Sequence, residues 1–376
     1  MATCEECRPA HQVDGALRQL GAEVRRIGVD AGLAAVGIGG AEVFTETRDH
    51  LRSRRAAGLH GGMQFTYRNP ERSTDPGRIL DGARSLVVGA WGYRRDDTPG
   101  EPTSVRPAGT VAGYARRDHY RSLRLALDQV ADRLRADGWH AVVVLDDNAL
   151  VDRAAAQRAG LGWFGRNSLL LLPGLGSWFV LGSVVTDAPL EPTLPIGPSD
   201  PGEGCGSCRR CITACPTGAL VADGVVDARR CLAWLVQAPG TFPVEHRRAL
   251  GSRIYGCDEC QEVCPVNRLA DRRHPPGVAE PDAVASVDLL DLLAASDQEL
   301  LASHGRWYIA RRDPRYLRRN ALVALGNVGD GDDGATASTL ARWVGGDDEL
   351  LAEHARWAAR SLGRADLADA PSGVHR

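Results

Sequence analysis

Residues 205–216 read Cys205-Gly-Ser-Cys208-Arg-Arg-Cys211-Ile-Thr-Ala-Cys215-Pro216. The spacing C-x2-C-x2-C-x3-C-P is typical of iron–sulfur sites in which three thiolates of one loop bind a cluster and the fourth binds another cluster. A second group reads Cys257-Asp-Glu-Cys260-Gln-Glu-Val-Cys264-Pro265 and is one cysteine short of the full pattern. Cys231 lies between the two groups and completes a set of eight. This stretch therefore predicts two [4Fe–4S] clusters in a domain of the bacterial ferredoxin type.

Crossed ligation divides these cysteines into two sets. The first set is Cys205, Cys208, Cys211 and Cys264, and the second set is Cys215, Cys231, Cys257 and Cys260. We do not expect disulfides, because the chain is 376 residues long and shows no signal-peptide pattern. Zinc binds C-x2-C pairs as well, but zinc does not require the full spacing found here. A further pair, Cys4 and Cys7, has no evident partner ligands, and we expect it to be incidental.

Composition restricts the remaining possibilities. The formal net charge is −3, so no field of the whole molecule predicts a nucleic-acid partner. The most apolar stretch, residues 168–185, is interrupted by Pro173 and several glycines, which indicates two strands and a turn and no membrane span. Oxygen-sensitive clusters without an export signal lead us to expect a cytoplasmic protein. The glycine-rich segments 37–40 and 160–165 lack the G-x-G-x-x-G pattern, so we do not expect NAD or FAD.

Apolar periodicity divides the chain into three parts. Helices are predicted over residues 14–33, 42–58 and 118–137, and strands over residues 85–91 and 140–145. This alternation favours an α/β domain. A proline-rich linker over residues 189–201 leads into the cysteine-rich part, and a break at Pro275–Pro276 begins an all-α region with helix pairs of a short HEAT-like solenoid. We predict domain limits at residues 1–190, 191–275 and 276–376.

Asp146 stands directly after the predicted strand 140–145. In open α/β sheets the carboxyl ends of the strands carry the active site, which makes Asp146 a candidate catalytic residue. An aspartate in this place is also commonly a solvated strand end or a helix N-cap. The pattern alone leaves these alternatives open.

Several segments together resemble the epoxyqueuosine reductase family, across nearly the whole chain. They are residues 159–167, 176–179, 205–220, 227–231, 253–260 and 318–327. The resemblance implies a cobalamin-binding α/β domain, two [4Fe–4S] clusters and an external electron donor of the flavodoxin or ferredoxin type. It also implies a tRNA substrate with a queuosine-type wobble base, from which the enzyme removes the epoxide oxygen in a two-electron reduction.

The resemblance assigns the role of proton donor to Asp146. In the family an Asp-Ser/Thr-Ala-Pro-x-x-Glu-Arg segment opens with this aspartate, and Arg153 matches its arginine. Between Asp146 and Arg153 this chain differs from the family pattern at all four specified positions. These positions carry Asp147, Asn148, Ala149 and Asp152. The family pattern also predicts residues that contact cobalamin. They are Asp146, Arg153, Asn167, Ser168, Ser177 and Trp178.

An arginine-rich segment opens the helical region. Its helical spacing and the implied substrate predict that four of its arginines contact tRNA. They are Arg312, Arg315, Arg318 and Arg319. A solvated helix surface is the simpler explanation of such a charge run. Three alternatives to the family's function stay open: a reductive-dehalogenase-like corrinoid reductase, a paralogue that acts on another small molecule, and an electron-transfer protein without catalysis.

Overall fold

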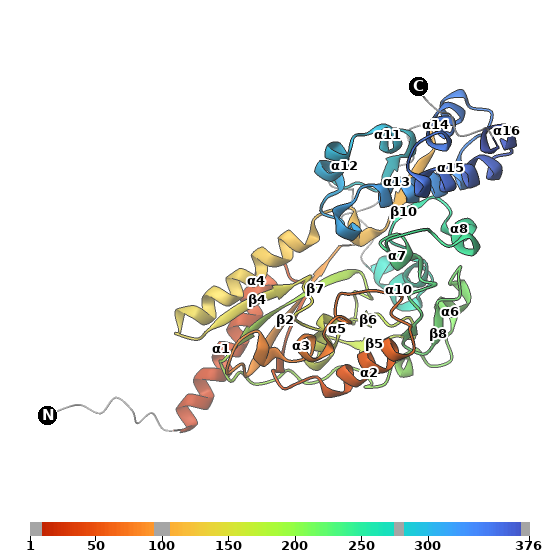
Figure 1. The fold of residues 1–376 in the computed structure, drawn as a ribbon. Helices are drawn as coiled ribbons and strands as arrows, with labels where there is room; N and C mark the ends of the chain where they lie inside the picture. Colours follow the sequence, from red (N-terminus) through yellow and green to blue (C-terminus); the bar gives the residue numbers. More distant parts are fainter. Residues whose placement is uncertain (1–9, 94–105, 274–281, 370–376) are drawn as a thin grey trace.

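The computed structural model describes residues 10–93, 106–273 and 282–369 (Figure 1). Its largest sheet has four strands in the order β1 (Ala35–Gly40), β2 (Ser85–Gly92), β7 (Phe179–Thr186) and β4 (Ala141–Leu145). All neighbouring strands are antiparallel. The central strands β2 and β7 are buried along almost their whole length because helices cover both faces of the sheet.

Helices α1 (Ala10–Asp30) and α4 (His119–Ala136) pack on one face of this sheet. In α4 the apolar residues Leu123, Leu127, Val130 and Leu134 recur every three or four positions and are fully buried. The Asp118 side chain caps the helix by accepting a hydrogen bond from the Arg121 N–H at 3.0 Å. The prediction of a helix over residues 118–137 is therefore confirmed to within one residue at each end.

The opposite face is covered by α5 (Asp152–Arg158), and α2 (Thr45–Ala56) contributes Leu51 to the same core. The short helix α3 (Pro70–Ser73) follows α2. This arrangement confirms the prediction of a mixed α/β fold. The strands, however, are antiparallel, so the rule for the carboxyl ends of parallel strands does not explain the position of Asp146. The strand that precedes it, β4, is an edge strand of the sheet.

The cysteine-rich part consists of short elements joined by loops. They are α6 (Arg210–Ala214), the hairpin β8 (Leu220–Ala222) with β9 (Val225–Val226), α7 (Leu232–Leu235), α8 (Val244–Leu250), α9 (Glu259–Glu262) and α10 (Pro265–Arg273). The hairpin of β5 (Trp163–Phe164) and β6 (Leu170–Leu171) precedes them and packs in the core of the α/β part. Helices α6 and α9, each of which carries one cysteine, pack against each other. The eight cysteine side chains of this part are half-buried.

The C-terminal part is helical. It contains α11 (Leu289–Ala294), α12 (Asp297–His304), α13 (Arg315–Val328), α14 (Gly334–Val344), α15 (Glu349–Ser361) and α16 (Ala365–Ala368). Helix α13 packs directly on α15, and a Cβ atom at Gly326 would lie 2.6 Å from the Cα atom of Ala358, so this close approach requires glycine. In Figure 1 these helices lie at the opposite end of the molecule from α1.

A second sheet joins all three parts of the chain. Strand β3 (Ala108–Val111) lies in its centre, parallel to β10 (Arg253–Tyr255) and antiparallel to β11 (Ser286–Asp288). One hydrophobic core surrounds this sheet and includes Val111, Ile254 and Leu322. The three parts of the chain are therefore held together by shared packing.

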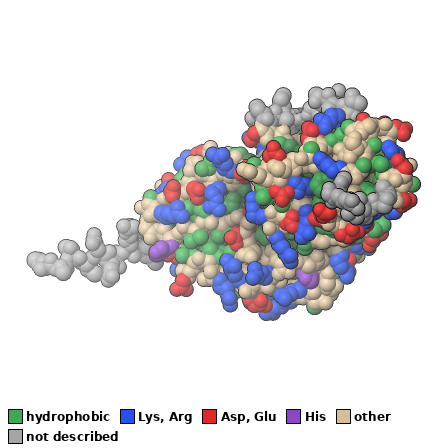
Figure 2. Space-filling view, turned by 45° about the horizontal axis from the view of Figure 1, so that its top comes forward, with side chains coloured by type: hydrophobic (Ala, Val, Ile, Leu, Met, Phe, Trp, Pro, Cys, Tyr) green, Lys and Arg blue, Asp and Glu red, His purple; other side chains and the backbone are tan. Residues whose placement is uncertain are grey.

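The surface carries both signs of charge. On the face shown in Figure 2, acidic and basic side chains are intermingled, as the small net charge suggests. Within the described ranges, no helix combines the length and the apolar character that crossing a bilayer requires. The Cys4–Cys7 pair and the break at Pro275–Pro276 lie outside the described residues.

Candidate active site

The first predicted set of cysteines is brought together in the structure. Burial raises the pKa of the Cys211 thiol, and the nearby thiols Cys205, Cys264 and Cys208 raise it further. Burial likewise raises the pKa of Cys264, with added contributions from Cys205 and Cys208. These four side chains therefore lie within electrostatic reach of one another, although Cys264 is about fifty residues away along the chain.

The second predicted set also gathers in one place. Burial raises the pKa of Cys257 to about 11 and raises that of Cys260 further, and Cys231 contributes to both shifts. Burial raises the pKa of Cys231, with Cys215 as its contributing thiol. Cys260 also interacts with Cys211 of the first set, so the two sets are adjacent.

The Cys215 thiol differs from the other shifted thiols, because its pKa is lowered. Burial alone would raise the pKa of Cys215, but the main-chain N–H groups of Thr217, Ala219 and Leu220 outweigh it and lower the pKa. Such N–H groups also tune the potential of a bound cluster.

Among the described residues, no three His, Cys, Asp or Glu side chains are arranged so that they could hold a single metal ion. Thiolates of a [4Fe–4S] cluster bind different irons, so they lie farther apart than the ligands of one ion.

Asp146 lies at the end of β4 in an unusual backbone conformation. Its φ angle is +48°, in the left-handed region that aspartate tolerates better than most residues. The carboxyl group is exposed, but surrounding protein partly removes its hydration. This desolvation raises the pKa of Asp146, and the negative charges of Asp147 and Asp118 raise it further. Asp146 therefore holds a proton more readily than an aspartate on an open surface.

A second carboxyl group, that of Asp152, lies close to Asp146. The buried Oδ1 atom of Asp152 has no hydrogen-bond partner among the described residues. Burial raises the pKa of Asp152 to about 8, Asp146 adds to the shift, and Arg153 opposes it. In the sequence, Asp152 stands out only as a departure from the family pattern. The apolar context Leu150-Val151-Asp152 and the three alanines after Arg153 could have indicated a buried carboxyl.

Two tyrosines, half-buried Tyr120 and buried Tyr255, complete the surroundings of Asp146. Burial raises the pKa of Tyr120, and the carboxylates of Asp146 and Asp152 raise it further. Burial also raises the pKa of Tyr255, to which Asp146 contributes. The Tyr255 hydroxyl accepts a hydrogen bond from the Tyr308 N–H at 2.8 Å and donates one to the Tyr308 carbonyl at 3.3 Å. Tyr255 therefore links the site around Asp146 to the segment that precedes α13.

Arg153 connects this site to the second set of cysteines. Its exposed guanidinium donates a hydrogen bond to the Ser168 carbonyl at 3.4 Å. Its positive charge also acts on Cys231, where it partly offsets the effect of burial on the pKa. Arg153 thus lies within electrostatic reach of both Asp152 and Cys231.

Three of the predicted cofactor contacts are buried in the protein instead. The Asn167 amide donates a hydrogen bond to the Cys260 carbonyl at 3.3 Å, and the Ser177 hydroxyl donates one to Gln261 Oε1 at 2.9 Å. Trp178 is 1% exposed and packs edge-on against the Tyr93 ring. A side chain enclosed by protein does not contact a bound cofactor, so the prediction is wrong for the side chains of Asn167, Ser177 and Trp178. Asn167 and Ser177 attach the α/β part to the cysteine-rich part.

The four predicted tRNA-contacting arginines have different surroundings. Arg319 is fully buried, and its prediction as a tRNA contact is wrong, because its donors bind main-chain carbonyls inside the protein. Arg318 is largely buried against Asp297 and the Ala295 carbonyl. Arg315 is half-buried and pairs with Asp313 at 2.6 Å.

Arg312 is exposed and donates a hydrogen bond to the Gly305 carbonyl at 3.1 Å. The neighbouring Arg311 is also exposed, and both residues have a positive φ angle. Tyr308 is 54% exposed and belongs to the same segment. Arg311 and Tyr308 lie in the arginine-rich segment for which the sequence suggests tRNA contacts, Arg311 as one of its basic residues and Tyr308 as a ring that could stack on a base.

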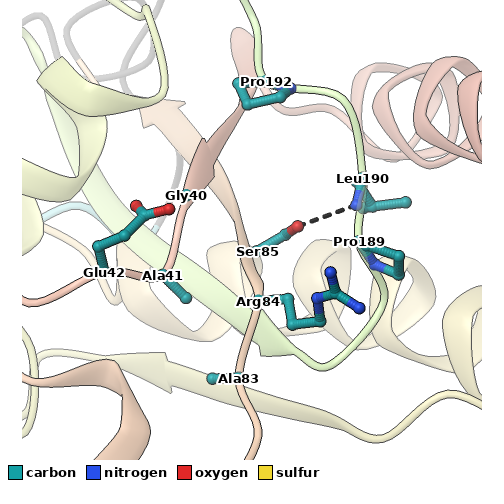
Figure 3. A pocket seen from close by; sticks show the side chains of 9 residues that line it. All are labelled: Gly40, Ala41, Glu42, Ala83, Arg84, Ser85, Pro189, Leu190 and Pro192. Carbon is teal, nitrogen blue, oxygen red and sulfur yellow. Dashed lines mark hydrogen bonds between the residues drawn. The ribbon is translucent and has the colours of Figure 1, made fainter.

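A separate hollow of about 390 Å³ lies elsewhere on the sheet (Figure 3). Gly40, Ser85 and the segment from Pro189 to Pro192 line it, and the Ser85 hydroxyl accepts a hydrogen bond from the Leu190 N–H at 3.0 Å. The strand registers place Ser85 next to Thr186, whereas Leu145, before Asp146, pairs with Gly182. The hollow is therefore at the other end of the sheet from Asp146 and is not part of that site.

Comparisons with known proteins agree with this arrangement. Residues 204–267 match the family model of a 4Fe-4S double cluster binding domain. The epoxyqueuosine reductase of Lactococcus garvieae is 34% identical over 319 residues, which cover 84% of this chain and 88% of that protein.

Solved structures of the same enzyme are similar along nearly the whole chain. One is an epoxyqueuosine reductase with an epoxyqueuosine-modified tRNA-Tyr stem loop, with a TM-score of 0.80, 31% identity, and coverage of 92% of this chain and 91% of that one. Another is the Bacillus subtilis epoxyqueuosine reductase, in a form whose catalytic loop, named after an aspartate, is swung out of the active site. It has a TM-score of 0.81, 30% identity and the same coverage. The sequence identity and the coverage together show that the chain belongs to the epoxyqueuosine reductase family.

Proposed function

We propose that this protein reduces epoxyqueuosine to queuosine at the wobble position of a tRNA anticodon. The observation that carries the proposal is the position of Asp146. Its carboxyl, with a raised pKa, lies close to Asp152, and the next residue, Arg153, reaches the second set of cysteines. A site that combines a proton donor with nearby redox centres suits a reductive deoxygenation, and relatives of the same length carry this activity in their names.

The reaction has a defined balance. The epoxide oxygen leaves as water, and a carbon–carbon double bond forms, which requires two electrons and two protons. The eight cysteines would hold two [4Fe–4S] clusters, which would supply single-electron transfer from an external donor of the flavodoxin or ferredoxin type. We assign the first cluster to Cys205, Cys208, Cys211 and Cys264, and the second cluster to Cys215, Cys231, Cys257 and Cys260. The second cluster is then the one near Arg153.

The residues around Asp146 fit a large polar cofactor such as cobalamin. Asp146 and Arg153 are exposed, and Asp146 and Ser168 have positive φ angles of 48° and 61°, a conformation that non-glycine residues adopt mainly at functional sites. Cobalamin, when bound, would supply a strongly reducing metal centre for the deoxygenation. Arg153 and the main chain at Ser168 would hold it, because its amide side chains are hydrogen-bond donors and acceptors.

Asp146 donates a proton to the departing oxygen. A general acid must be protonated at the working pH, and partial desolvation together with Asp147 and Asp118 moves the pKa of Asp146 in that direction. Its exposure leaves it accessible to a bound nucleotide.

The tRNA reaches this site along the segment before α13. Tyr308 is hydrogen-bonded to Tyr255, which in turn interacts with Asp146, so the segment borders the active site. Exposed Arg311 and Arg312 suit phosphate contacts, and exposed Tyr308 suits stacking on a base of an opened anticodon loop. In this proposal residues 1–190 bind cobalamin, residues 191–275 hold the clusters and residues 276–376 form a HEAT-like region that contacts tRNA.

An anaerobic assay tests the proposal. The protein is reconstituted with iron, sulfide and cobalamin, the iron and cobalt contents are measured, and a reductant and an epoxyqueuosine-containing stem loop are added. We expect a nucleoside product that is lighter by one oxygen, and loss of product formation in Asp146→Ala. Asp81→Ala is the matched control, because it removes an exposed carboxyl near the end of the sheet that lies away from Asp146 and should retain activity.

Other outcomes identify the alternatives. Bound cobalt without turnover of the stem loop would indicate a corrinoid reductase with another substrate. Iron without cobalt, together with no turnover, would indicate an electron-transfer protein.

A further inference from the structure

The proposed reaction consumes two protons, but the exposed site offers one obvious donor. The oxygen keeps both bonding pairs of its C–O bonds, and the two supplied electrons form the new π bond. Breaking the first C–O bond leaves a hydroxyl group after one protonation, and breaking the second releases water after another. Asp146 has given up its proton after the first step, so it must be reloaded before the second step.

We infer that Asp152 is the proton reserve of this site and reloads Asp146 during the reaction. This inference rests on the proposed function and deepens it. Asp152 acts through Asp146 and does not touch the substrate, because its Oδ1 atom is buried. Asp152 is therefore a proton-relay residue, and Asp146 remains the group that meets the departing oxygen.

The surroundings of Asp152 favour its protonated form. An ionised carboxylate would place a charged oxygen, Oδ1, in a buried position where no described residue donates a hydrogen bond. A protonated carboxyl avoids most of this cost. The position of Asp152 at the start of α5 favours the ionised form. Burial nevertheless raises the pKa of Asp152 to about 8.

The charged and titratable groups around Asp152 come from three places. Asp146 and Asp147 precede α5, Arg153 follows Asp152 in the helix, and Tyr120 belongs to α4. Strands β1, β2 and β7, on which α5 packs, contain no titratable residue. Only Arg153 favours ionisation of Asp152, and its guanidinium is hydrogen-bonded to the Ser168 carbonyl. The net effect of all these groups is a pKa of about 8 for Asp152.

The two carboxyl groups have complementary properties for a relay. Asp146 is exposed, whereas Asp152 is shielded and keeps its proton at neutral pH. Departing hydroxide has a much higher proton affinity than either carboxylate, so it drives the transfer from Asp152 through Asp146. Solvent protons restore Asp152 after the product has left.

The experiment compares Asp152→Asn and Asp152→Glu with the wild-type holoenzyme. Single-turnover rates with the epoxyqueuosine stem loop are measured between pH 6 and pH 9 at saturating reductant. We expect the wild-type rate to fall as the pH rises through the range in which Asp152 ionises. Asp152→Asn should be slower by roughly tenfold or more and should lack this fall, because an amide holds no transferable proton. Asp152→Glu should restore both the rate and the pH profile.

A second readout does not depend on turnover. Infrared difference spectra between the wild type and Asp152→Asn should show a protonated carboxylic acid at pH 7 that disappears as the pH is raised. Asp81→Asn is the matched control for both readouts, because it removes an exposed carboxyl near the end of the sheet that lies away from Asp146. Iron content and melting temperature establish that each variant is folded and loaded.

The outcomes separate this inference from the proposed function. A wild type that does not reduce the stem loop would overturn the proposed function, and the relay with it. A wild type that does, together with an Asp152→Asn variant of unchanged rate and unchanged pH profile, would overturn the relay alone. Ionised Asp152 at pH 7 in the infrared spectra would overturn it as well.

Discussion

The guanidinium of Arg319 donates a hydrogen bond to the main-chain carbonyl of Leu235 at 2.9 Å. Arg319 lies on α13, and Leu235 lies four residues after Cys231. The same guanidinium binds the carbonyls of Ala238 and Gly240 at 2.7 Å and 2.6 Å. The C-terminal helices are thus fastened to the segment that follows a proposed ligand of the second cluster.

The next residue of α13 extends this attachment. The Asn320 amide donates hydrogen bonds to the Val236 carbonyl at 2.8 Å and to the Ile254 carbonyl at 3.2 Å. Ile254 belongs to β10, shortly before Cys257. Both chain segments that lead to or from the second set of cysteines therefore depend on one turn of α13. This contact gives the C-terminal helices a structural role at the second cluster in addition to their proposed role in tRNA binding.

Arg319→Ala should destabilise the protein strongly. The substitution leaves several buried carbonyl groups without donors and opens a cavity, which together cost about 3 kcal/mol or more of the free energy of unfolding. Arg319→Lys should recover only part of the loss, because an ammonium lacks the planar arrangement of donors. Denaturant titration measures the stability, and iron content measures the retention of the second cluster. A variant with wild-type stability would contradict the structural role of Arg319.

Arg312→Ala should weaken tRNA binding and leave the stability of the protein nearly unchanged. Arg312 is exposed, so we expect a change in the free energy of unfolding of only about 0.5 kcal/mol or less. Binding to the tRNA stem loop should weaken, and the slope of log affinity against log salt should fall by about one, as expected for the loss of one phosphate contact. Unchanged affinity at low salt would remove Arg312 from the proposed tRNA surface. Arg364→Ala, at the start of α16 and paired with Asp366, is a control that should not change binding.

These arginines show how far the sequence could lead. The spacing of cysteines is fixed by the geometry of a cluster and by short loops, so the pattern from Cys205 to Cys264 was informative without a structure. A helical charge run, in contrast, does not reveal which arginines face a partner segment. The carbonyls that bind Arg319 lie about eighty residues away in the chain. Their positions depend on tertiary packing that local periodicity does not encode.

The candidate site shows the same limit. The position of Asp146 after an apolar strand was predictable from the local pattern, and β4 ends one residue before it. The pairing of β3 with β10 and β11 was not predictable, because these strands come from distant parts of the chain. Since this pairing helps to position Tyr255 beside Asp146, Tyr255 could not be identified as part of the site from the sequence.

The pH dependence of stability should reveal the buried carboxyl of Asp152. Its pKa is raised from an unfolded value of about 4 to about 8 in the folded protein. The folded state therefore binds one more proton than the unfolded state within this range, and stability falls as the pH rises from about 4 to about 8. Asp152 contributes at most about 1.4 kcal/mol per pH unit to this slope. Thermal unfolding at several pH values should show a flatter profile for Asp152→Asn than for the wild type, and parallel profiles would contradict the raised pKa.

His354 should produce a loss of stability at the acidic side. Burial lowers the pKa of His354 to about 4, and the neutral ring accepts a hydrogen bond from the Phe242 N–H at 3.1 Å. A group with a lowered pKa stabilises the folded state above its unfolded value of about 6.5, and this contribution is lost as the pH falls toward about 4. His354→Gln should reduce the loss of stability between pH 6 and pH 4, which unfolding experiments measure. An unchanged acid profile would show that His354 does not titrate with unfolding.

Cys231→Ser should separate the two clusters. Cys231 occupies the place of the cysteine that is missing from the second group, and its thiol interacts with Cys215, Cys257 and Cys260. Removing this thiolate should lower the iron content from about eight to about four per chain, with the first cluster intact, because each [4Fe–4S] cluster depends on its own four thiolates. Cys4→Ser is the matched control and should leave the iron content unchanged. Loss of all iron in Cys231→Ser would contradict this independence and would show that the two clusters assemble as one unit. The interaction between Cys260 and Cys211, which belong to different sets, would account for such a result.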